Sequence, residues 1–353
     1  MESQCGDRLG GGRHENGQGT PNLGCRIGTV RRTGVPCVSA LKDTRCAVLG
    51  AGGFLGTTLC QRLRGQTAAL RAFGRRQSFP DALRGIEWLT GDFADIQHVK
   101  EAIHGCDTVF HLANATTPAS ANQDKIADLQ SNVASTLGLL DACRDLGIKR
   151  IIFISSGGTI YGLPKQVPTP ESAPTMPITA YGISKLSIEK YLALYEYLHG
   201  IEYRVLRVAN PFGPYQTAIK SQGAIAAFMQ RCLDDAPLQI WGDGSVVRDY
   251  IYADDVIDAL IQAVKHEGTS RVFNVGAGHG RSLLDIIQAI ESVSGRSLAV
   301  EFLPKRDMDV PCSVLDTSLA AQELGWHAKT PFPEGIRQTW AWISNRHLIK
   351  HHS

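Results

Sequence analysis

Tyr181 and Lys185 are the two residues in this chain whose types and spacing most directly suggest chemistry. They stand four apart in TAYGISKLSIEK, so on an α-helix they lie on one face, one turn apart. A neighbouring ammonium favours phenolate over phenol, which predicts a lowered pKa for Tyr181. Such a phenol can take or give a proton near neutral pH. A Tyr and a Lys without any catalytic role have the same spacing on many half-exposed helices. The choice between a catalytic and a structural pair therefore depends on other parts of the sequence.

A glycine-rich turn about 130 residues upstream supports a catalytic role for the pair. The apolar stretch CAVLG predicts a strand that runs into GAGGFLG and then into an amphipathic helix over Phe54–Arg64. Gly50 permits the tight turn, Gly53 lets a pyrophosphate approach, and Gly56 lets helix and strand pack closely. The helix N-terminus offers free N–H groups to phosphates. A bound dinucleotide beside a poised proton would make an alcohol dehydrogenase centre.

The end of the next predicted strand bears on the choice of cofactor. This strand, Ala68–Phe73, is followed by Gly74, Arg75 and Arg76. An acidic residue there would bond the adenosine ribose hydroxyls and favour NAD, whereas arginines pair with a 2′-phosphate. We therefore predict NADP in preference to NAD. The alternative is that both arginines lie in a solvated loop.

Strands and helices alternate from Arg45 to about residue 210. This alternation predicts an α/β fold with a Rossmann-type, doubly wound parallel sheet and right-handed crossovers. The further predicted strands are Ile86–Asp92, Asp107–Ala113, Arg150–Ser156 and Glu202–Val208, and the helices between them are Asp95–His104 and Asn122–Leu146.

Several polar residues fall at the ends of these elements. Asp92 is placed either to meet the adenine amino group or to cap the following helix. Asn132, among small and apolar neighbours, is either structural or supports the active site, because a buried Asn must find partners. The hydroxyls of Ser155, Ser156 and Thr159 are candidates to bond a substrate oxygen near Tyr181.

Composition narrows the class of protein. The chain has 353 residues, 43% apolar and 20% charged, with a net charge of +2, which predicts no nucleic-acid partner. No apolar run approaches the roughly 20 residues of a membrane span. None of the nine cysteines is in a CxxC arrangement, which favours buried free thiols, no metal site and a cytoplasmic location.

The chain divides into four predicted parts. Residues 1–43 are rich in Gly, Arg and Asn without period and are interpreted as a disordered extension. Residues 44–209 form the dinucleotide-binding domain with the catalytic helix. Residues 210–346, where the alternation loosens, form a smaller mixed α/β substrate lobe, and residues 347–353 a frayed tail.

At this point the chain resembles the extended short-chain dehydrogenase/reductase family of NDP-sugar epimerases, dehydratases and reductases, and is UDP-glucose 4-epimerase-like. The resemblance covers residues 45 to about 345. It is carried jointly by GAGGFLG, GDF, HLA, SSGGTIYG, YGISK, RVANPFGP, VRDYIYADD, KRDMDV and DTSLAAQELGW.

The resemblance implies roles for individual residues. Tyr181 would be the acid/base, and Lys185 would hold the nicotinamide ribose. Asn210 would touch the substrate diphosphate, which Arg248 and Arg306 would clamp through paired charge-assisted bonds, and Asp309 would contact the nucleotide ribose. Without the resemblance, Arg248 would be interpreted as a surface cation on a strand. The implied cofactor-binding residues are Gly50, Gly53, Phe54, Leu55, Gly56, Arg75, Arg76, Asp92, Phe93, Leu112, Ala113, Tyr181 and Lys185.

The sequence departs from the family pattern at the third catalytic hydroxyl. The family carries Ser or Thr four residues before the Tyr of its xxYG turn, and here that residue is Gly157, before Tyr161. Ser156 or Thr159 would substitute from one side. The second departure is FGRR, where NAD-using epimerases have an acidic residue.

Three functions remain open. The first is an NDP-hexose 4-epimerase that works through a 4-keto sugar, and the second is an NADPH-dependent reductase of an NDP-4-keto-6-deoxy sugar. The third is a non-catalytic NADP-binding protein. A 4,6-dehydratase is disfavoured, because its Asp-Glu pair is replaced by Gly158 and Thr159. The family also implies a homodimer formed through the helix of Lys185 and the helix near Asn132.

Overall fold

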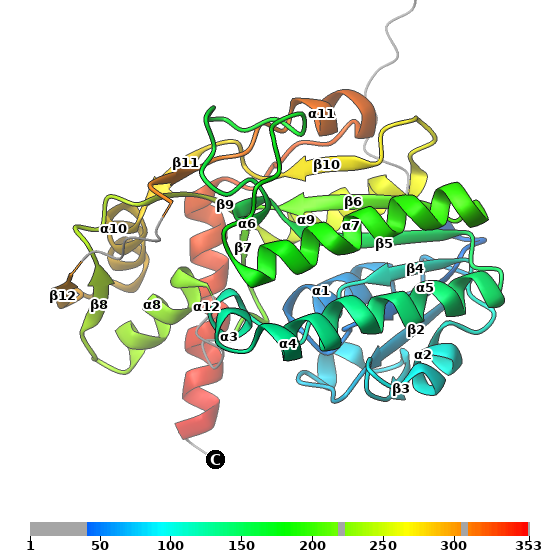
Figure 1. The fold of residues 1–353 in the computed structure, drawn as a ribbon. Helices are drawn as coiled ribbons and strands as arrows, with labels where there is room; N and C mark the ends of the chain where they lie inside the picture. Colours follow the sequence, from blue (N-terminus) through cyan, green and yellow to red (C-terminus); the bar gives the residue numbers. More distant parts are fainter. Residues whose placement is uncertain (1–40, 218–222, 305–309, 352–353) are drawn as a thin grey trace, which may run out of the picture. The chain divides into compact units, whose positions relative to one another are not determined.

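Seven parallel strands form the central sheet, in the order β10-β6-β5-β4-β1-β2-β3 (Figure 1). This is the Rossmann-type doubly wound sheet that the sequence predicted. The computed structural model describes residues 41–217, 223–304 and 310–351. Arg306 and Asp309 of the predicted phosphate and ribose contacts lie outside the described residues, as do residues 1–40 of the predicted extension.

The elements follow the predicted ones closely in the first half of the chain. The strands of the central sheet are β1 Arg45–Leu49, β2 Ala69–Gly74, β3 Glu87–Thr90, β4 Thr108–His111, β5 Arg150–Ser156, β6 Glu202–Val208 and β10 Val272–Val275. The helices are α1 Phe54–Leu63, α2 Ile96–Ile103, α3 Pro118–Gln123, α4 Lys125–Asp128, α5 Ser135–Asp145, α6 Gly157–Ile160, α7 Ala180–His199, α8 Ala224–Leu233, α9 Ala253–Lys265, α10 Leu283–Ser294, α11 Ser318–Leu324 and α12 Phe332–His351.

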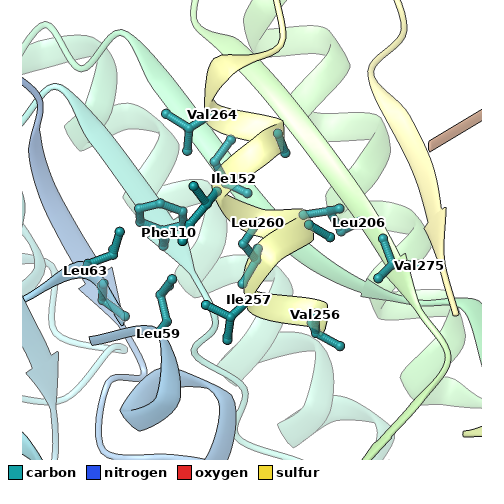
Figure 2. Packing of buried hydrophobic residues seen from close by; sticks show 14 of the residues in the cluster. Leu59, Leu63, Phe110, Ile152, Leu206, Val256, Ile257, Leu260, Val264 and Val275 are labelled. Carbon is teal, nitrogen blue, oxygen red and sulfur yellow. The ribbon is translucent and has the colours of Figure 1, made fainter. Parts of the chain in front are cut away.

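Helices cover both faces of the central sheet, which is why its inner strands read as nearly continuous apolar runs. On one face, side chains of α1 and α9 pack against Phe110, Ile152 and Leu206 of β4, β5 and β6 (Figure 2). On the other face, α2, α5 and α7 pack against residues such as Phe153 of β5. The sheet therefore lies between two apolar layers.

The central sheet draws on residues from both predicted lobes. The prediction places a boundary after Ala209, yet β10 pairs in parallel with β6, with Phe273 opposite Leu206. Helix α9 also follows that boundary, and its Ile257 and Leu260 lie fully buried against the sheet (Figure 2). The chain thus returns to the central sheet after it has formed the first elements of the predicted substrate lobe.

The structure also differs from the outer boundaries that were predicted at residues 44 and 346. Leu41 is buried in the core beside α1, so folded structure begins before residue 44. Helix α12 runs on to His351, past the predicted boundary at residue 346.

A second group of elements lies beyond β6. Strand β9, Val247–Tyr252, pairs with β7, Asn210–Phe212, with β11, Gly280–Ser282, and with β13, Cys312–Ser313. Strands β8, Leu238–Trp241, and β12, Val300–Leu303, form a separate parallel pair. The buried residues of α8, α10 and α12 gather in one apolar cluster with Phe212 and Tyr252.

The single helix predicted over residues 122–146 is confirmed from Lys125 to Asp145, where the backbone is helical throughout, and is broken at Asp124, which separates α3 from α4. Asp124 has extended backbone (φ −132°), and its side chain caps α4 by accepting from the Ala127 N–H. A π-helical segment, Leu129–Ala134, then precedes α5. A side chain that bonds the backbone favours the break at Asp124, and the π-helical segment lies inside the helix that follows it.

No helix of the described residues combines the length and the apolar run needed to cross a membrane. Within the same described ranges, no group of three or more His, Cys, Asp and Glu side chains is arranged to hold a metal ion.

Candidate active site

The glycine turn between β1 and α1 packs against the ends of two neighbouring strands. The N–H of Gly50 donates to the Phe73 carbonyl of β2 at 2.9 Å. Gly50 has φ +87°, and a Cβ there would lie 2.7 Å from the Ala113 nitrogen. A Cβ at Gly56 would lie 2.2 Å from the Gly50 carbonyl oxygen. Both glycines therefore have the steric reasons that the sequence predicted.

The start of α1 fits the pyrophosphate of a dinucleotide. Gly53 is the N-cap residue and offers no side-chain cap to the helix. A Cβ at Gly53 would meet only the Gly50 carbonyl oxygen, at 3.3 Å, so its outer side is open. The first-turn N–H groups carry the partial positive charge of the helix end. Contact of Gly53, Phe54 and Leu55 with the cofactor stays a prediction, which this geometry fits.

The two arginines predicted to select the cofactor follow β2 with exposed side chains. A Cβ at Gly52 would lie 2.1 Å from the Arg76 carbonyl oxygen, so the arginine segment packs on the glycine turn. Across the described ranges, neither Arg75 nor Arg76 forms an ion pair with a carboxylate. Their guanidinium groups are free to meet a ligand.

Asp92 and Phe93 follow β3. The Asp92 carboxylate accepts from the Ala94 N–H at 3.0 Å, whereas Asp95 caps α2 by accepting from the Gln97 N–H. The interpretation of Asp92 as the helix cap is therefore wrong, and its contact with adenine stays a prediction. The Phe93 ring lies 4.9 Å from the ring of His111.

Helix α7 brings Tyr181 and Lys185 to the carboxyl end of β5. The helix begins after Thr179, whose side chain accepts from the Gly182 N–H. Lys185 is 5% exposed, and its Nζ donates to the Ile154 carbonyl of β5 at 3.0 Å. The same Nζ lies 5.6 Å from the centre of the Tyr181 ring. The predicted pair shares one face, as its spacing required.

Burial dominates the ionisation of both groups. It lowers the pKa of Lys185 to about 8, against the opposing charges of Asp128 and Glu189. Burial, together with the charge of Asp128, raises the pKa of Tyr181 to about 12. The predicted lowering of the Tyr181 pKa is therefore wrong for the protein by itself. Desolvation of the phenolate outweighs the neighbouring ammonium.

Two hydroxyls near the start of α7 are buried without a hydrogen-bond partner in the described structure, Ser155 Oγ and Thr159 Oγ1. The Thr159 carbonyl lies 2.9 Å from where a Cβ of Gly182 would be, so α6 touches the first turn of α7. Ser156, at the end of β5, is half-buried. Buried polar atoms without partners are rare and are expected where a ligand supplies the missing bond.

Gly157 stands in a position that has no room for a side chain. A Cβ there would lie 2.4 Å from Leu315 Cδ1 and 2.9 Å from the Arg207 carbonyl oxygen. The hydroxyl that the family carries at this position would therefore displace its neighbours. At Gly158, by contrast, a Cβ would meet nothing within 4 Å.

Asn210 and Arg248 lie close together on the paired strands β7 and β9. The Asn210 amide donates to the Asp249 carbonyl at 3.0 Å. Arg248 is half-buried, and its guanidinium donates to the Val310 carbonyl at 2.6 Å. The described structure thus ties Arg248 to the chain just after residues 305–309, where the resemblance places Arg306 and Asp309. Substrate contact of these residues stays a prediction.

One charged residue of the site, Asp128, was not predicted from the sequence. It is 1% exposed, and the Ser184 hydroxyl donates to its Oδ2 at 2.5 Å. The Asn132 amide donates to its Oδ1 at 2.9 Å. Asn132 is therefore part of a buried network beside Tyr181 and Lys185. An acidic residue four positions before a buried Asn, on one helix face, was the available signal.

Comparison with known proteins places this geometry in a family. The sequence profile of the NAD dependent epimerase/dehydratase family matches residues 46–276. The chain belongs to this family. The match begins at β1 and ends just after β10, so it spans the whole seven-stranded sheet.

Curated relatives of this epimerase/dehydratase family include more than one activity. The UDP-glucose 4-epimerase of Mycolicibacterium smegmatis is 32% identical over 86% of this chain and 99% of its own length. The dTDP-4-dehydro-6-deoxyglucose reductase of Escherichia coli is 29% identical over 82% of this chain and 94% of its own. Among solved structures, the UDP-glucose 4-epimerase of Thermotoga maritima with UDP-glucose has a TM-score of 0.82 at 32% identity. The structural match covers 86% of this chain and 99% of the Thermotoga maritima chain.

Replacing Gly157 by Ser should destabilise the protein and should not raise its turnover. The added side chain overlaps Leu315 and a backbone carbonyl, and overpacking of this kind costs about 1–3 kcal/mol of unfolding free energy. Gly158→Ala is the matched control, since its methyl enters open space, and should change stability by less than about 1 kcal/mol. Denaturant unfolding measures both, and equal stabilities would contradict the crowding.

Proposed function

We propose that this protein is a UDP-glucose-like NDP-hexose 4-epimerase that works through a 4-keto sugar. The observation that carries the proposal is the placement of Tyr181 and Lys185. They lie on the helix face that meets the carboxyl end of β5, with Lys185 bonded to the Ile154 carbonyl. The curated UDP-glucose 4-epimerase relative, aligned over nearly its whole length, supports the same activity.

The sheet order supports a dinucleotide beside this pair. The order reverses between β1 and β4, and ligands of open α/β sheets bind outside the strand ends at such a switch point. Strand β5 is the neighbour of β4, so the Lys185 anchor lies two strands from the glycine turn. Neighbouring strands are about 4.8 Å apart, so the anchor and the turn are about 10 Å from each other. A dinucleotide held at its pyrophosphate spans that distance.

Residues of this chain would handle the proton while a bound nicotinamide dinucleotide supplies a hydride acceptor and donor. Tyr181 would accept the proton of the sugar C4 hydroxyl and later return it. The raised pKa of Tyr181 keeps the phenol protonated in the protein by itself. A positively charged ligand beside the ring would favour the phenolate, as does the Lys185 ammonium. Thr159 and Ser155 would bond a substrate oxygen, which is supported by the lack of any other described partner for their hydroxyls.

The two arms of one assay decide the function. Purified protein is incubated with UDP-glucose, and separately with a 4-keto-6-deoxy nucleotide sugar plus NADPH. The proposal predicts interconversion of UDP-glucose and its C4 epimer without net cofactor consumption. Stoichiometric loss of NADPH absorbance would instead identify a reductase, and no reaction in either arm would contradict both activities and favour a non-catalytic NADP-binding protein.

Tyr181→Phe should keep cofactor affinity and lose turnover about 10²–10⁴-fold, because it removes the acid/base and little else. Tyr197→Phe is the matched control, since Tyr197 lies on the same helix and is 86% exposed. It should leave kcat unchanged. Retained turnover in Tyr181→Phe would remove the phenol from the acid/base role.

A reductase is the second candidate, and two observations favour it. One is the Escherichia coli reductase among the curated relatives. The other is the arginine pair after β2, because a cofactor that is consumed in each turnover is often NADPH. The Tyr181–Lys185 arrangement serves both reactions, since in a reductase the phenol donates its proton to the new alkoxide.

Within the NAD(P) cofactors, we propose NADP. Arg75 and Arg76 are exposed, belong to no described ion pair and follow β2 directly, where the ribose of a bound dinucleotide would lie. The proposed substrate contacts Asn210, Arg248, Arg306 and Asp309 would hold the diphosphate and ribose of the sugar nucleotide at the opposite end of the site.

NADP should bind more tightly than NAD, and Arg75→Ala with Arg76→Ala should remove the difference. Each charge-assisted bond to a phosphate is worth about 1.5–3 kcal/mol, so the double variant should lose at least about tenfold in NADP affinity. Arg84→Ala, at another exposed arginine of the same connection, is the control. Fluorescence titration with NADPH and with NADH measures the affinities of the parent protein, the double variant and the control. Equal affinities of the parent protein for the two cofactors would contradict the proposal.

We also propose a homodimer through α7 and the α4–α5 region, which lie side by side on one face of the sheet (Figure 1). Their outer sides carry exposed apolar residues. Ile126 is 71% exposed and Tyr197 is 86% exposed. Exposed apolar patches of this kind mark association surfaces. The other exposed apolar residues on these segments are Leu129, Ile183, Leu194 and Leu198.

Light scattering should give twice the 38.3 kDa chain mass. Leu194→Glu with Tyr197→Glu should raise the dissociation constant by at least about tenfold, because charges at the centre of an apolar interface cost more than 1 kcal/mol. Leu284→Glu, at an exposed apolar site on α10, should leave the mass unchanged. A monomeric parent protein would contradict this proposal.

A further inference from the structure

One buried carboxylate joins three segments of the chain around the candidate active site. Asp128 ends α4 and is 1% exposed. Its Oδ2 accepts from the Ser184 hydroxyl at 2.5 Å, and its Oδ1 accepts from the Asn132 amide at 2.9 Å and from the Thr116 hydroxyl. Thr116 lies in the loop after β4, Asn132 in the π-helical segment, and Ser184 in the first turns of α7.

The network holds the loop after β4 at more than one point. The side-chain oxygen of Asn132 accepts from the Ala115 N–H at 3.0 Å. The side-chain nitrogen of Asn132 also donates to the Thr116 hydroxyl at 2.9 Å. The residues just before this loop, Leu112 and Ala113, border the glycine turn. The same carboxylate therefore connects the strand end beside the cofactor site with the helix that carries Tyr181.

The hydrogen-bond donors to the Asp128 carboxylate are all neutral in the described structure. A buried carboxylate without an ion pair is costly, so its neighbourhood must compensate the charge. The available cation is Lys185, one residue after Ser184 on α7. The charge of Asp128 favours the Lys185 ammonium and opposes a Tyr181 phenolate, in the directions that the pKa shifts of both residues show.

The π-helical segment begins directly after Asp128 and contains Asn132. A π-turn inserts an extra residue into a helix and is frequent at functional sites, because it changes the direction of side chains. Here it accompanies two side chains, Asp128 and Asn132, that both bond the loop at Thr116.

We propose that Asp128 is a positioning residue for the acid/base pair, which fixes the loop at residues 114–117 against the first turns of α7 and sets the charge around Tyr181. This inference rests on the proposed C4 chemistry. It assigns Asp128 an effect on the proton-transfer step, with little effect on cofactor affinity, because none of the described hydrogen bonds of its carboxylate reaches the glycine turn or the arginines after β2.

Asp128→Asn tests the proposal, because it keeps the volume and the capacity for hydrogen bonds and removes the charge. Its kcat should fall at least about tenfold, within the range of impaired acid/base catalysis, while the NADPH dissociation constant stays within about threefold. Asp124→Asn is the matched control. Asp124 is exposed and caps the same helix, and Asn caps equally well, so kcat should not change.

The pH profile of kcat separates positioning from a merely structural role. The charged and titratable groups around the pair are Asp128 from α4, Lys185 and Glu189 from α7, and His111 from β4. Without the charge of Asp128, the Tyr181 phenolate and the neutral Lys185 amine both form at lower pH. The whole profile of Asp128→Asn should therefore move towards acid. An unchanged kcat and profile would overturn the proposal, as would a loss of activity that simply follows a lower melting temperature and cofactor release.

Ser184→Ala gives a second route to the same answer if the Asp128 variant is unstable. Because Ser184 acts through its bond to Asp128, the effects on kcat of the two substitutions should be less than additive. Additive effects would overturn the link between them.

Hydrogen exchange keeps this inference apart from the proposed function. If the parent protein converts neither sugar nucleotide, the proposed function fails, while amide exchange still reports on Asp128. The amides of Gly182–Lys185 should exchange faster in Asp128→Asn than in the parent protein and in Asp124→Asn. Equal exchange rates would overturn the positioning role whatever the activity.

Discussion

The site depends on keeping the Lys185 ammonium out of water beside the end of β5. At 5% exposure this cation is costly to bury, and burial lowers its pKa to about 8 even against the charges of Asp128 and Glu189. The Ile154 carbonyl, which accepts a hydrogen bond from Lys185 Nζ at 3.0 Å, and the charges of Asp128 and Glu189 offset that cost. Because the carbonyl belongs to the sheet, the hydrogen bond that stabilises the buried ammonium also holds α7 in position along β5.

The same helix face is held again one turn further on. Glu189 forms a buried ion pair with Arg207 of β6 at 2.7 Å, and Arg207 also donates to the Tyr161 hydroxyl at 2.9 Å. Tyr161 in turn donates to Asn274 of β10 at 2.7 Å. Such a pair is weak evidence for stability, since both charges lose water on burial, but it specifies one arrangement of the groups that share it. Tyr181 thus lies on a helix whose position on the sheet is specified by polar contacts as well as by apolar packing.

The fold was predictable from sequence wherever a short-range rule applied. Glycine spacing, apolar strand runs and the four-residue interval of Tyr181 and Lys185 each act within a few residues, and the structure confirms the elements they predict. Interactions between distant parts were not predictable in this way. The predicted direction of the Tyr181 pKa shift was wrong, because desolvation depends on every element around the phenol. Asp128 was missed because Ser184 lies 56 positions away in the chain. The crowding at Gly157 comes from Leu315, which no local pattern connects to it.

The return of the chain to the central sheet has a consequence for how this architecture can be divided. A fragment that stops at Ala209 would lack β10 and α9. Its last strand, β6, would then present an unpaired edge, and the apolar residues of β4, β5 and β6 that α9 covers would face water. Exposed edges and apolar faces of that kind promote aggregation. The two lobes therefore cannot be exchanged between relatives as independent modules, and recombination within this family should succeed only when the segment carrying α9 and β10 travels with the nucleotide-binding half.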